Sequence, residues 1–399
     1  MSLIRMSYTP TVKSKMKFQT AATIIFVLAL ATTARADGEK DNFNPVSTAV
    51  NSLKIGADAR AGGMGDVGAA TDPDVNSQAW NPAKYPFAIS RAGIAVNYTP
   101  WLRKIVNDID LGYVAGYMRL GDYTALSSSL RYFSLGQVDA GDNLTIKPYE
   151  LAFDFAVSRM LSDNLSAAIA LRYIRSDLSG NYSDDTKPGN AFAADVAMYY
   201  NRYVMMGSRE CQFAFGLNIS NIGSKMKFGD ENSYFIPTNL RLGFNYLVPI
   251  NEYNKIAFAL DLNKLLVPTM PRQGDDESSE DYQQRLQDDY YNMSPITGIF
   301  KSFGDAPGGF SEELKEIQWS VGVEYTYNDK FILRAGYHDE DKNKGNRKYF
   351  TVGAGFRMNV FSIDAGYVLS TAASNPLDQT LRVSLAFDFD GIKDLFSRR

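Results

Sequence analysis

The sequence predicts an all-β protein, a fourteen-stranded transmembrane β-barrel of the outer-membrane type with an N-terminal plug. Three observations predict this fold. Apolar and polar residues alternate with a period of two in run after run from residue 89 to the end. The connections between these runs alternate between short and long. About fifty residues without such alternation precede the first run, and they are rich in Gly, Ala, Asp and Asn.

The first 36 residues are predicted to be a signal peptide. Three lysines at positions 13–17 precede an apolar run at 21–31, which is shorter than the ~20 residues needed to span a bilayer. The Ala-Arg-Ala sequence at 34–36 supplies the small residues that signal peptidase recognises. Met16 would begin a signal peptide of more ordinary length than Met1, and the sequence leaves the choice between these two starts open. We therefore expect a mature chain that begins directly after this site and is exported across an inner membrane.

Composition argues against an enzyme. The 399 residues include one cysteine, Cys211, and one histidine, His338, which excludes an intramolecular disulfide and a metal site built from several Cys or His residues. We therefore predict no catalytic residues, no metal site and no cofactor. Without the five basic residues of the signal peptide, 36 basic residues stand against 45 acidic ones, and the resulting charge of −9 argues against a nucleic-acid partner.

Residues 37–88 are predicted to form a luminal or periplasmic plug. Their glycines, aspartates and asparagines favour tight turns over strands. The lumen of a barrel with about fourteen strands is wide enough to need filling. A compact segment directly ahead of the first strand is the natural candidate to fill it.

Residues 89–399 are predicted to form the barrel. In the run 150–158, for example, Leu, Phe, Phe and Val alternate with Glu, Ala, Asp, Ala and Ser, as expected for a strand with one apolar and one polar or small face. Each run is close to the ~10 residues that a tilted strand needs to cross a membrane. The fourteen predicted strands are 89–98, 109–120, 123–134, 149–160, 164–175, 190–204, 211–222, 237–249, 253–264, 317–327, 331–338, 347–358, 361–370 and 379–389.

The connections between strands indicate a membrane barrel rather than a secreted soluble β-sandwich. Short connections such as 121–122 alternate with long ones such as 265–316. Outer-membrane barrels have short periplasmic turns and long outer loops, whereas a sandwich need not sort its loops by length. The predicted location is therefore the cell outer membrane, and the even strand count predicts that both termini are periplasmic.

The predicted inward-facing positions are mostly Gly, Ala, Ser and charged residues. Charged side chains are costly on the lipid face and are tolerated inside a barrel. We therefore expect five arginines to pair with luminal carboxylates. The arginines are Arg172, Arg241, Arg334, Arg357 and Arg382, and the carboxylates are Glu150, Asp154, Asp261, Glu324, Asp364 and Asp388.

The longest connection, 265–316, is the candidate partner-binding loop. It contains an acidic run at 275–289 and is expected to form a short helix around 282–290. One interpretation is a solvated acidic loop whose aromatic residues pack on the barrel rim. The other is an extracellular docking element with apolar anchors for a protein partner. A third interpretation is calcium binding at the carboxylates, which however lack EF-hand spacing. The candidate anchors are Ile296, Ile299, Phe300, Phe303 and Phe310.

A resemblance to a known family supports the predicted barrel with an N-terminal plug. The sequence Gly-Gly-Met-Gly at 62–65, followed by Trp80 and then Asn81, Pro82 and Ala83, is similar to the N-terminal hatch of the FadL family of fourteen-stranded fatty-acid transporters. The chain from residue 55 to its final strand more closely resembles the PorV (LptO) family, FadL-like outer-membrane proteins of the type IX secretion system of Bacteroidetes. We assign Asn81, Pro82 and Ala83 a structural role, in a turn that holds the plug in the lumen.

Two functions follow as expectations. The resemblance to PorV implies a protein that binds the C-terminal signal domain of secreted cargo. It would carry the cargo from the translocon barrel to a surface complex with the sortase-like PorU, where the cargo is attached to lipopolysaccharide. The alternative is a FadL-type channel for uptake of a hydrophobic small molecule, which requires an apolar luminal pocket. A lipopolysaccharide-modifying enzyme is disfavoured by the shortage of catalytic residue sets.

Overall fold

A computed structural model describes residues 43–103, 106–139, 145–178, 187–229, 232–274, 276–370 and 379–392. The predicted signal peptide lies outside the described residues. Within the described part of the chain, no helix is both long and apolar enough to cross a membrane.

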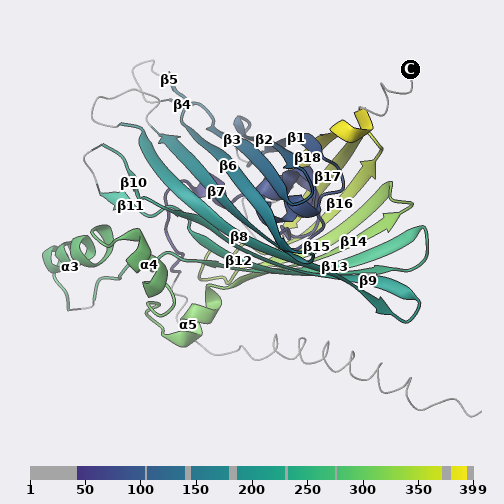
Figure 1. Ribbon diagram of the computed structural model, residues 1–399. Coiled ribbons are helices and arrows are strands. Elements are labelled where there is room, and N and C mark those ends of the chain that lie inside the picture. Colours follow the sequence, from purple (N-terminus) through teal and green to yellow (C-terminus); the bar gives the residue numbers. More distant parts are fainter. Residues whose placement is uncertain are drawn as a thin grey trace, which may run out of the picture. The chain divides into compact units, whose positions relative to one another are not determined.

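Fourteen antiparallel strands close into a barrel in which each strand pairs with its neighbours in sequence order and β1 pairs with β18 (Figure 1). This confirms the predicted strand number, and the strand ends differ from the predictions by a few residues. The wall consists of β1 Ala92–Pro100, β2 Ile109–Leu120, β3 Thr124–Leu135, β6 Tyr149–Ser162, β7 Leu165–Asp177, β8 Gly189–Met206, β9 Arg209–Gly223, β12 Asn239–Pro249, β13 Asn254–Leu265, β14 Gln318–Tyr327, β15 Phe331–Asp339, β16 Tyr349–Arg357, β17 Phe361–Ser370 and β18 Leu381–Asp388.

Side chains alternate between the two faces of this wall, as the period of two predicts. On β6, the outward side chains of Phe153, Phe155 and Val157 are 44–47% exposed, and the residues between them are at most 5% exposed. The outward face of the other strands also carries large apolar side chains. Such a wall matches the lipid-facing surface of an outer-membrane barrel.

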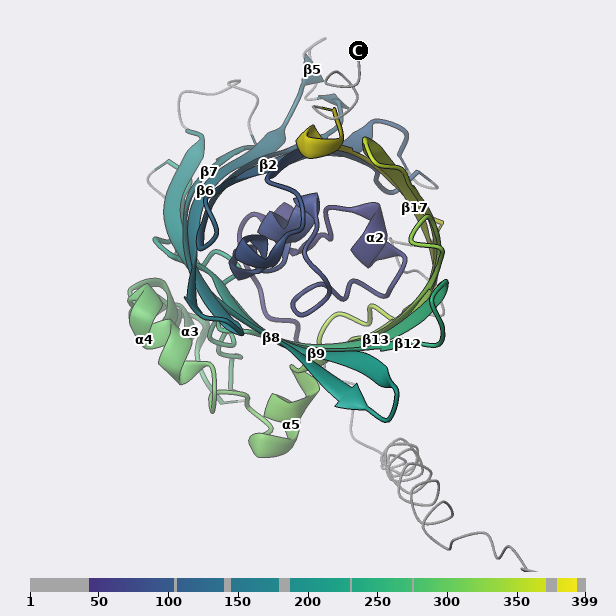
Figure 2. The same ribbon diagram turned by 45° about the vertical axis from the view of Figure 1, so that its right-hand side comes forward.

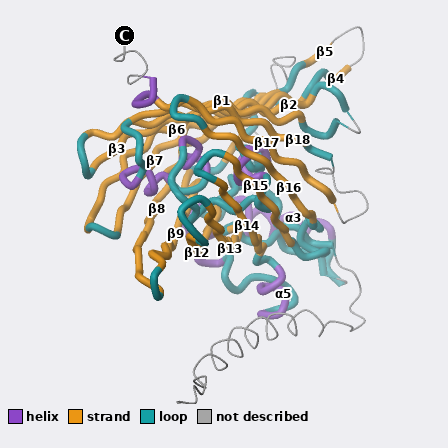
Figure 3. Tube along the Cα trace, turned by 90° about the vertical axis from the view of Figure 1, so that its right-hand side faces the viewer, coloured by secondary structure: helices purple, strands orange, loops and turns teal. Residues whose placement is uncertain are grey.

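The two ends of the barrel differ in the length of their connections. At one end, which we call the short-turn end, consecutive strands join through turns such as Gly121–Tyr123 and Asn328–Lys330. The opposite, long-loop end carries the extended connections. Two of these contain small hairpins that no sequence pattern predicted, β4 Val138–Asp139 with β5 Thr145–Ile146, and β10 Met226–Lys227 with β11 Ser233–Tyr234. Figure 3 shows the β4–β5 hairpin at one end of the tilted strands.

Residues 43–88, here called the inner segment, lie inside the barrel, where Figure 2 shows them surrounded by the wall. They form four short helices: η1 Asn51–Lys54, α2 Ala59–Gly62, η2 Val75–Ala79 and η3 Pro82–Phe87. No strand forms there, as the composition predicts.

The inner segment crosses the lumen once from end to end. Its start lies at the long-loop end, where the amide of Asn44 donates to the carbonyl of Asn343 at 2.7 Å. Its last residue, Ala88, lies at the short-turn end, where its carbonyl accepts a hydrogen bond from Arg119 at 2.8 Å. The two ends of the described chain therefore lie at opposite ends of the barrel. This arrangement arises because the inner segment adds one crossing to the fourteen strands. The termini themselves lie outside the described residues, and the expectation that both are periplasmic stays a prediction.

The connection between β13 and β14, residues 266–317, is here called the helical loop. The helix predicted around 282–290 is present as α3 Ser279–Leu286 followed by a π-helical turn, η4 Gln287–Tyr291. Two further helices, α4 Pro295–Lys301 and α5 Phe310–Lys315, were not predicted. Figure 2 shows α3, α4 and α5 outside the barrel circumference, near β8 and β9.

Candidate functional site: the inner segment and the helical loop

Asn81 connects three parts of the lumen through its side-chain amide. The amide nitrogen donates to the carbonyl of Ala69 at 3.0 Å and to that of Met198 on β8 at 2.9 Å. The amide oxygen accepts from the backbone of Ala83 at 3.0 Å, which caps η3. Pro82 occupies the first turn of η3, where a missing backbone N–H costs nothing. Asn81 and Ala83 are completely buried, so these bonds form without competition from solvent.

Glycines on the wall allow the inner segment to lie directly on the strands. A Cβ atom at Gly216 on β9 would stand 2.0 Å from the carbonyl oxygen of Ala69. A Cβ atom at Gly336 on β15 would stand 2.1 Å from the backbone of Met64. No side chain fits at either distance, so both contacts require glycine.

Buried charges join the inner segment to the wall on the side of β13 to β18. Glu324 accepts from Arg60 of the inner segment at 3.1 Å and from Arg334 of the wall at 2.7 Å. The fully buried carboxylate of Asp261 accepts from the backbone amides of Gly68 and Ala69 at 2.9 and 3.0 Å. Each of these carboxylates thus binds a cation or backbone donors of the inner segment.

The predicted luminal arginine pairs form in part. Arg172 pairs with Asp154 and with Asp195, and Arg241 pairs with Asp261 at 3.3 Å. Arg382 departs from the prediction because its partner is Asp66 of the inner segment rather than a carboxylate of the wall.

Arg334 pairs with two of the predicted carboxylates, Glu324 at 2.7 Å and Asp364 at 2.6 Å. Two other predicted carboxylates instead contact residues that precede the first strand. Glu150 accepts from the backbone amide of Ser52 at 3.2 Å, and Asp388 accepts from the hydroxyl of Ser90. Reasoning that considered only the strands missed the contribution of residues 43–90.

Two carboxylates of the inner segment show opposite electrostatic effects. Burial and the nearby charge of Asp74 raise the pKa of Asp58 to about 6. Burial would also raise the pKa of Asp66, but the charge and hydrogen bond of Arg382, with a hydrogen bond from Tyr349, hold that pKa at about 2. Asp66 is therefore a permanent anion that fixes the inner segment to β16 and β18.

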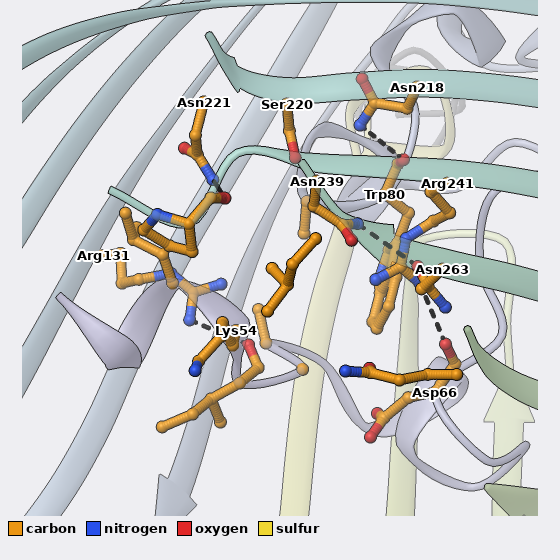
Figure 4. Close-up of a pocket in the computed structure, with 18 of the residues that line it drawn as sticks. Lys54, Asp66, Trp80, Arg131, Asn218, Ser220, Asn221, Asn239, Arg241 and Asn263 are labelled. Atoms are coloured by element: carbon orange, nitrogen blue, oxygen red, sulfur yellow. Dashed lines mark hydrogen bonds between the residues drawn. The ribbon is translucent and has the colours of Figure 1, made fainter. Parts of the chain in front are cut away.

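The lumen contains a polar cavity of about 100 Å³ between the inner segment and the wall (Figure 4). The guanidinium of Arg241 stacks on the indole of Trp80 at 4.6 Å, and the amide of Asn218 donates to the Trp80 carbonyl at 3.0 Å. The single histidine, His338, is buried here and hydrogen-bonds the hydroxyl of Ser320 at 2.8 Å. Polar and charged side chains make up most of the lining, so this cavity does not suit an apolar ligand.

The helical loop is anchored to the barrel by its inner face. Leu286 and Tyr290 are buried against Phe235 and Leu265 of the wall and its loops, and against Val46 of the inner segment. A cation reinforces this core, because Lys225 donates to the carbonyls of residues 290 and 291 at 2.9 and 3.0 Å and lies 3.9 Å from the Phe235 ring centre.

Two lysines fix the other end of the loop. Lys264 pairs with Glu313 and Glu316, at 3.0 and 2.7 Å, and Lys344 pairs with Glu312 and Glu316, at 2.6 and 3.0 Å. Part of the acidic composition of the loop therefore serves internal ion pairs. Among the described residues, no group of three or more His, Cys, Asp or Glu side chains is placed to hold a metal ion.

The candidate anchors of the helical loop differ in their exposure. Ile296, Phe300, Phe303 and Phe310 are 53–76% exposed, and Ile299 is half-buried. Sequence reasoning missed Leu314, which is 49% exposed on α5; its position one helical turn after Phe310 would have indicated it. Four of the five predicted residues are thus exposed on a loop that buried contacts and ion pairs hold against the barrel.

The family model described as "Type IX secretion system protein PorV" matches residues 37–272. Comparison of the sequence with curated proteins found no match.

Solved structures with similarity to the chain include a Pseudomonas aeruginosa FadL homologue, with 11% identity over 87% of this chain and 99% of that one and a TM-score of 0.44. They also include the Pseudomonas putida toluene transporter TodX, with 9% identity over 84% and 96% and a TM-score of 0.47. The family match covers more than half of the chain, and the chain therefore belongs to the PorV family of outer-membrane components of the type IX secretion system.

Proposed function

We propose that this protein binds the C-terminal signal domain of secreted cargo and carries it from the translocon barrel to the surface attachment complex that contains PorU. In this proposal the protein is a carrier and performs no chemistry. Its partners are the translocon, the cargo signal domains, the attachment-complex proteins and the lipid and lipopolysaccharide around the barrel.

The observation that carries this proposal is the exposure of four large apolar side chains, Ile296, Phe300, Phe303 and Phe310, on the helical loop. Burying one large apolar side chain stabilises a complex by about 1.5–3 kcal/mol. The most exposed anchors, Phe300 and Phe310, lie on different helices, and buried contacts and ion pairs fix the loop behind them. A fixed support lowers the entropy that would be lost when a partner orders the loop. These properties favour protein docking over a solvated loop.

The orientation and the plug are further parts of the proposal. We place the long-loop end outside the cell and the short-turn end in the periplasm, because outer-membrane barrels have that arrangement. The inner segment then acts as the plug of the lumen. The hydrogen bonds of Asn81 and the start of η3 at Pro82 and Ala83 support a structural role for this motif.

The lining of the central cavity favours this carrier over passage of a hydrophobic molecule through the lumen. The central cavity is small, at about 100 Å³, and polar, with Arg131, Arg172 and Arg241 among its lining residues. A hydrophobic substrate that moved past the inner segment would have to displace water from these charged groups, and this desolvation costs free energy.

Affinity purification of the tagged protein from outer membranes, followed by mass spectrometry, tests the proposal. We expect secreted proteins with an uncleaved C-terminal signal domain, together with a very large translocon barrel. The double variant Phe300→Ser, Phe310→Ser should lose the cargo. The matched control Tyr253→Ser changes an exposed aromatic residue in a short turn at the opposite end and should retain it. A protein that elutes without cargo but with a bound fatty acid would refute the carrier and support uptake.

A further inference from the structure

A second cavity lies at the long-loop end of the barrel, beside the polar one. Its volume is about 410 Å³. Its walls include the inner segment, the start of β2, the end of β3 and the connection after β15. Most of its lining is apolar. The principal apolar side chains are Val46, Ile55, Trp101, Ile109, Phe133 and Leu265.

Lys54 lines this apolar cavity and also the smaller polar one, where Figure 4 shows it. Its ammonium group makes no hydrogen bond or ion pair with any other described residue. The nearby Arg347 is already neutralised by Glu340, at 2.7 Å. Burial and the positive charge of Arg347 lower the pKa of Lys54 to about 8, so the group remains mostly protonated at neutral pH. The cavity therefore combines an apolar lining with an unpaired cation.

A second cation in the polar cavity also lacks a carboxylate partner among the described residues. Arg131 donates to the backbone carbonyls of Ser52 and Ile55, both at 3.0 Å, on either side of Lys54 in the chain. These bonds hold the backbone of residues 52–55 in place. Because both acceptors are neutral carbonyls, they do not compensate the positive charge of the guanidinium. The local surplus of positive charge is thus suited to a single anionic group.

A ligand for this site needs an apolar part for the cavity and one negative charge for Lys54. A cargo signal domain, which the proposed function makes the ligand, has one such group whatever its sequence: the α-carboxylate at its end, next to the last side chains. Recognition of a chain end through its carboxylate is an established mode of peptide binding.

Resting on the proposed function, we propose that this cavity binds the C-terminal end of the cargo signal domain. The last apolar side chains enter the cavity, and the α-carboxylate accepts a charge-assisted hydrogen bond from the Lys54 ammonium. The helical loop and this cavity then read different features of the same ligand, its folded surface and its chain end.

Binding of a purified cargo signal domain to the protein in detergent tests this inference. The domain is prepared once with a free C-terminal carboxylate and once with a C-terminal amide. A hydrogen bond between charged groups corresponds to a change in affinity of about tenfold. We therefore expect the acid to bind the wild-type protein about tenfold more tightly than the amide. Lys54→Met should bind both forms equally, whereas Lys54→Arg should keep the difference.

The matched control is Lys255→Met, which removes an exposed lysine that pairs with Asp329 at the short-turn end and should keep the difference between acid and amide. Equal binding of acid and amide to the wild-type protein would overturn this inference and leave the proposed function intact. Failure of both forms to bind would overturn the proposed function itself, and this inference with it.

Discussion

Replacement of Asn81 should detach the inner segment from the wall. Asn81→Ala removes the helix cap, which costs about 1 kcal/mol of stability. It also removes the two buried hydrogen bonds that the Asn81 amide donates, at a cost of about 1 kcal/mol each. A total of about 3 kcal/mol raises the population of the detached segment roughly a hundredfold. Asn81→Asp should have a larger effect, because it keeps the acceptor for Ala83 but places a carboxylate oxygen against the carbonyls of Ala69 and Met198.

The rate of thiol labelling measures this population. Ala70 is completely buried, so a cysteine introduced there by Ala70→Cys, in a Cys211→Ser background, reacts only when the segment opens. We expect labelling roughly a hundred times faster in Asn81→Ala than in its parent. The control Asn190→Ala changes an exposed asparagine on β8 and should label at the parent rate. If Asn81→Ala labels as slowly as its parent while the barrel still resists heat in detergent, the structural role of the motif is refuted.

Three further predictions concern other parts of the fold. Gly216→Ala should destabilise the inner segment because the new Cβ atom would lie 2.0 Å from the Ala69 carbonyl oxygen. Gly304→Ala should have no such effect, because its new Cβ atom would meet no other atom within 4 Å. The same labelling assay compares the two variants. Burial, with Glu313 and Glu316 nearby, raises the pKa of Asp305 in the helical loop to about 6, above its unfolded value of 3.8. The docking of the loop should therefore weaken as the pH rises from about 4 to 6 and stay constant above pH 6. Protease resistance of the loop at about pH 4.5 and 7.5 measures this change, and the difference should vanish in Asp305→Asn. An epitope inserted directly before Phe43 should be reached by antibody on intact cells as readily as one inserted at Gly304, because Asn44 and the helical loop lie at the same end of the barrel; labelling of the Gly304 epitope alone would contradict this.

The wall of the barrel could be predicted from sequence because each strand carries its own signal. Along β6 the alternation of Phe153, Phe155 and Val157 with small or polar residues indicates which face of the strand contacts lipid. The helix at α3 was predictable for a similar reason, since a local run of good helix formers follows the cap at Ser278.

The path of the inner segment could not be predicted, because long-range contacts determine it. Asp66 pairs with Arg382, which is 316 residues away, and Asn44 bonds Glu312, 268 residues away. No local pattern marks either pair. The motif at Asn81 was found through the family resemblance, whereas its hydrogen-bond partners Ala69 and Met198 were apparent only in the structure.

Lys54 was missed for a different reason. In the sequence it is one of many lysines, and its interest arises from what surrounds it: an apolar cavity on one side, Arg347 on the other and no partner for its charge among the described residues. A surplus charge is a property of the folded arrangement rather than of the sequence.

The central claim, that the helical loop binds cargo, is tested most directly by site-specific photocrosslinking in living cells. A photoreactive phenylalanine analogue replaces Phe300 or Phe310 on the loop or, as a control, Phe350, which is 53% exposed on the outward face of β16. We predict that both loop positions crosslink to secreted proteins that still carry their C-terminal signal domain, and that position 350 does not. Loop positions that crosslink to no protein, or to the same proteins as position 350, would contradict the claim.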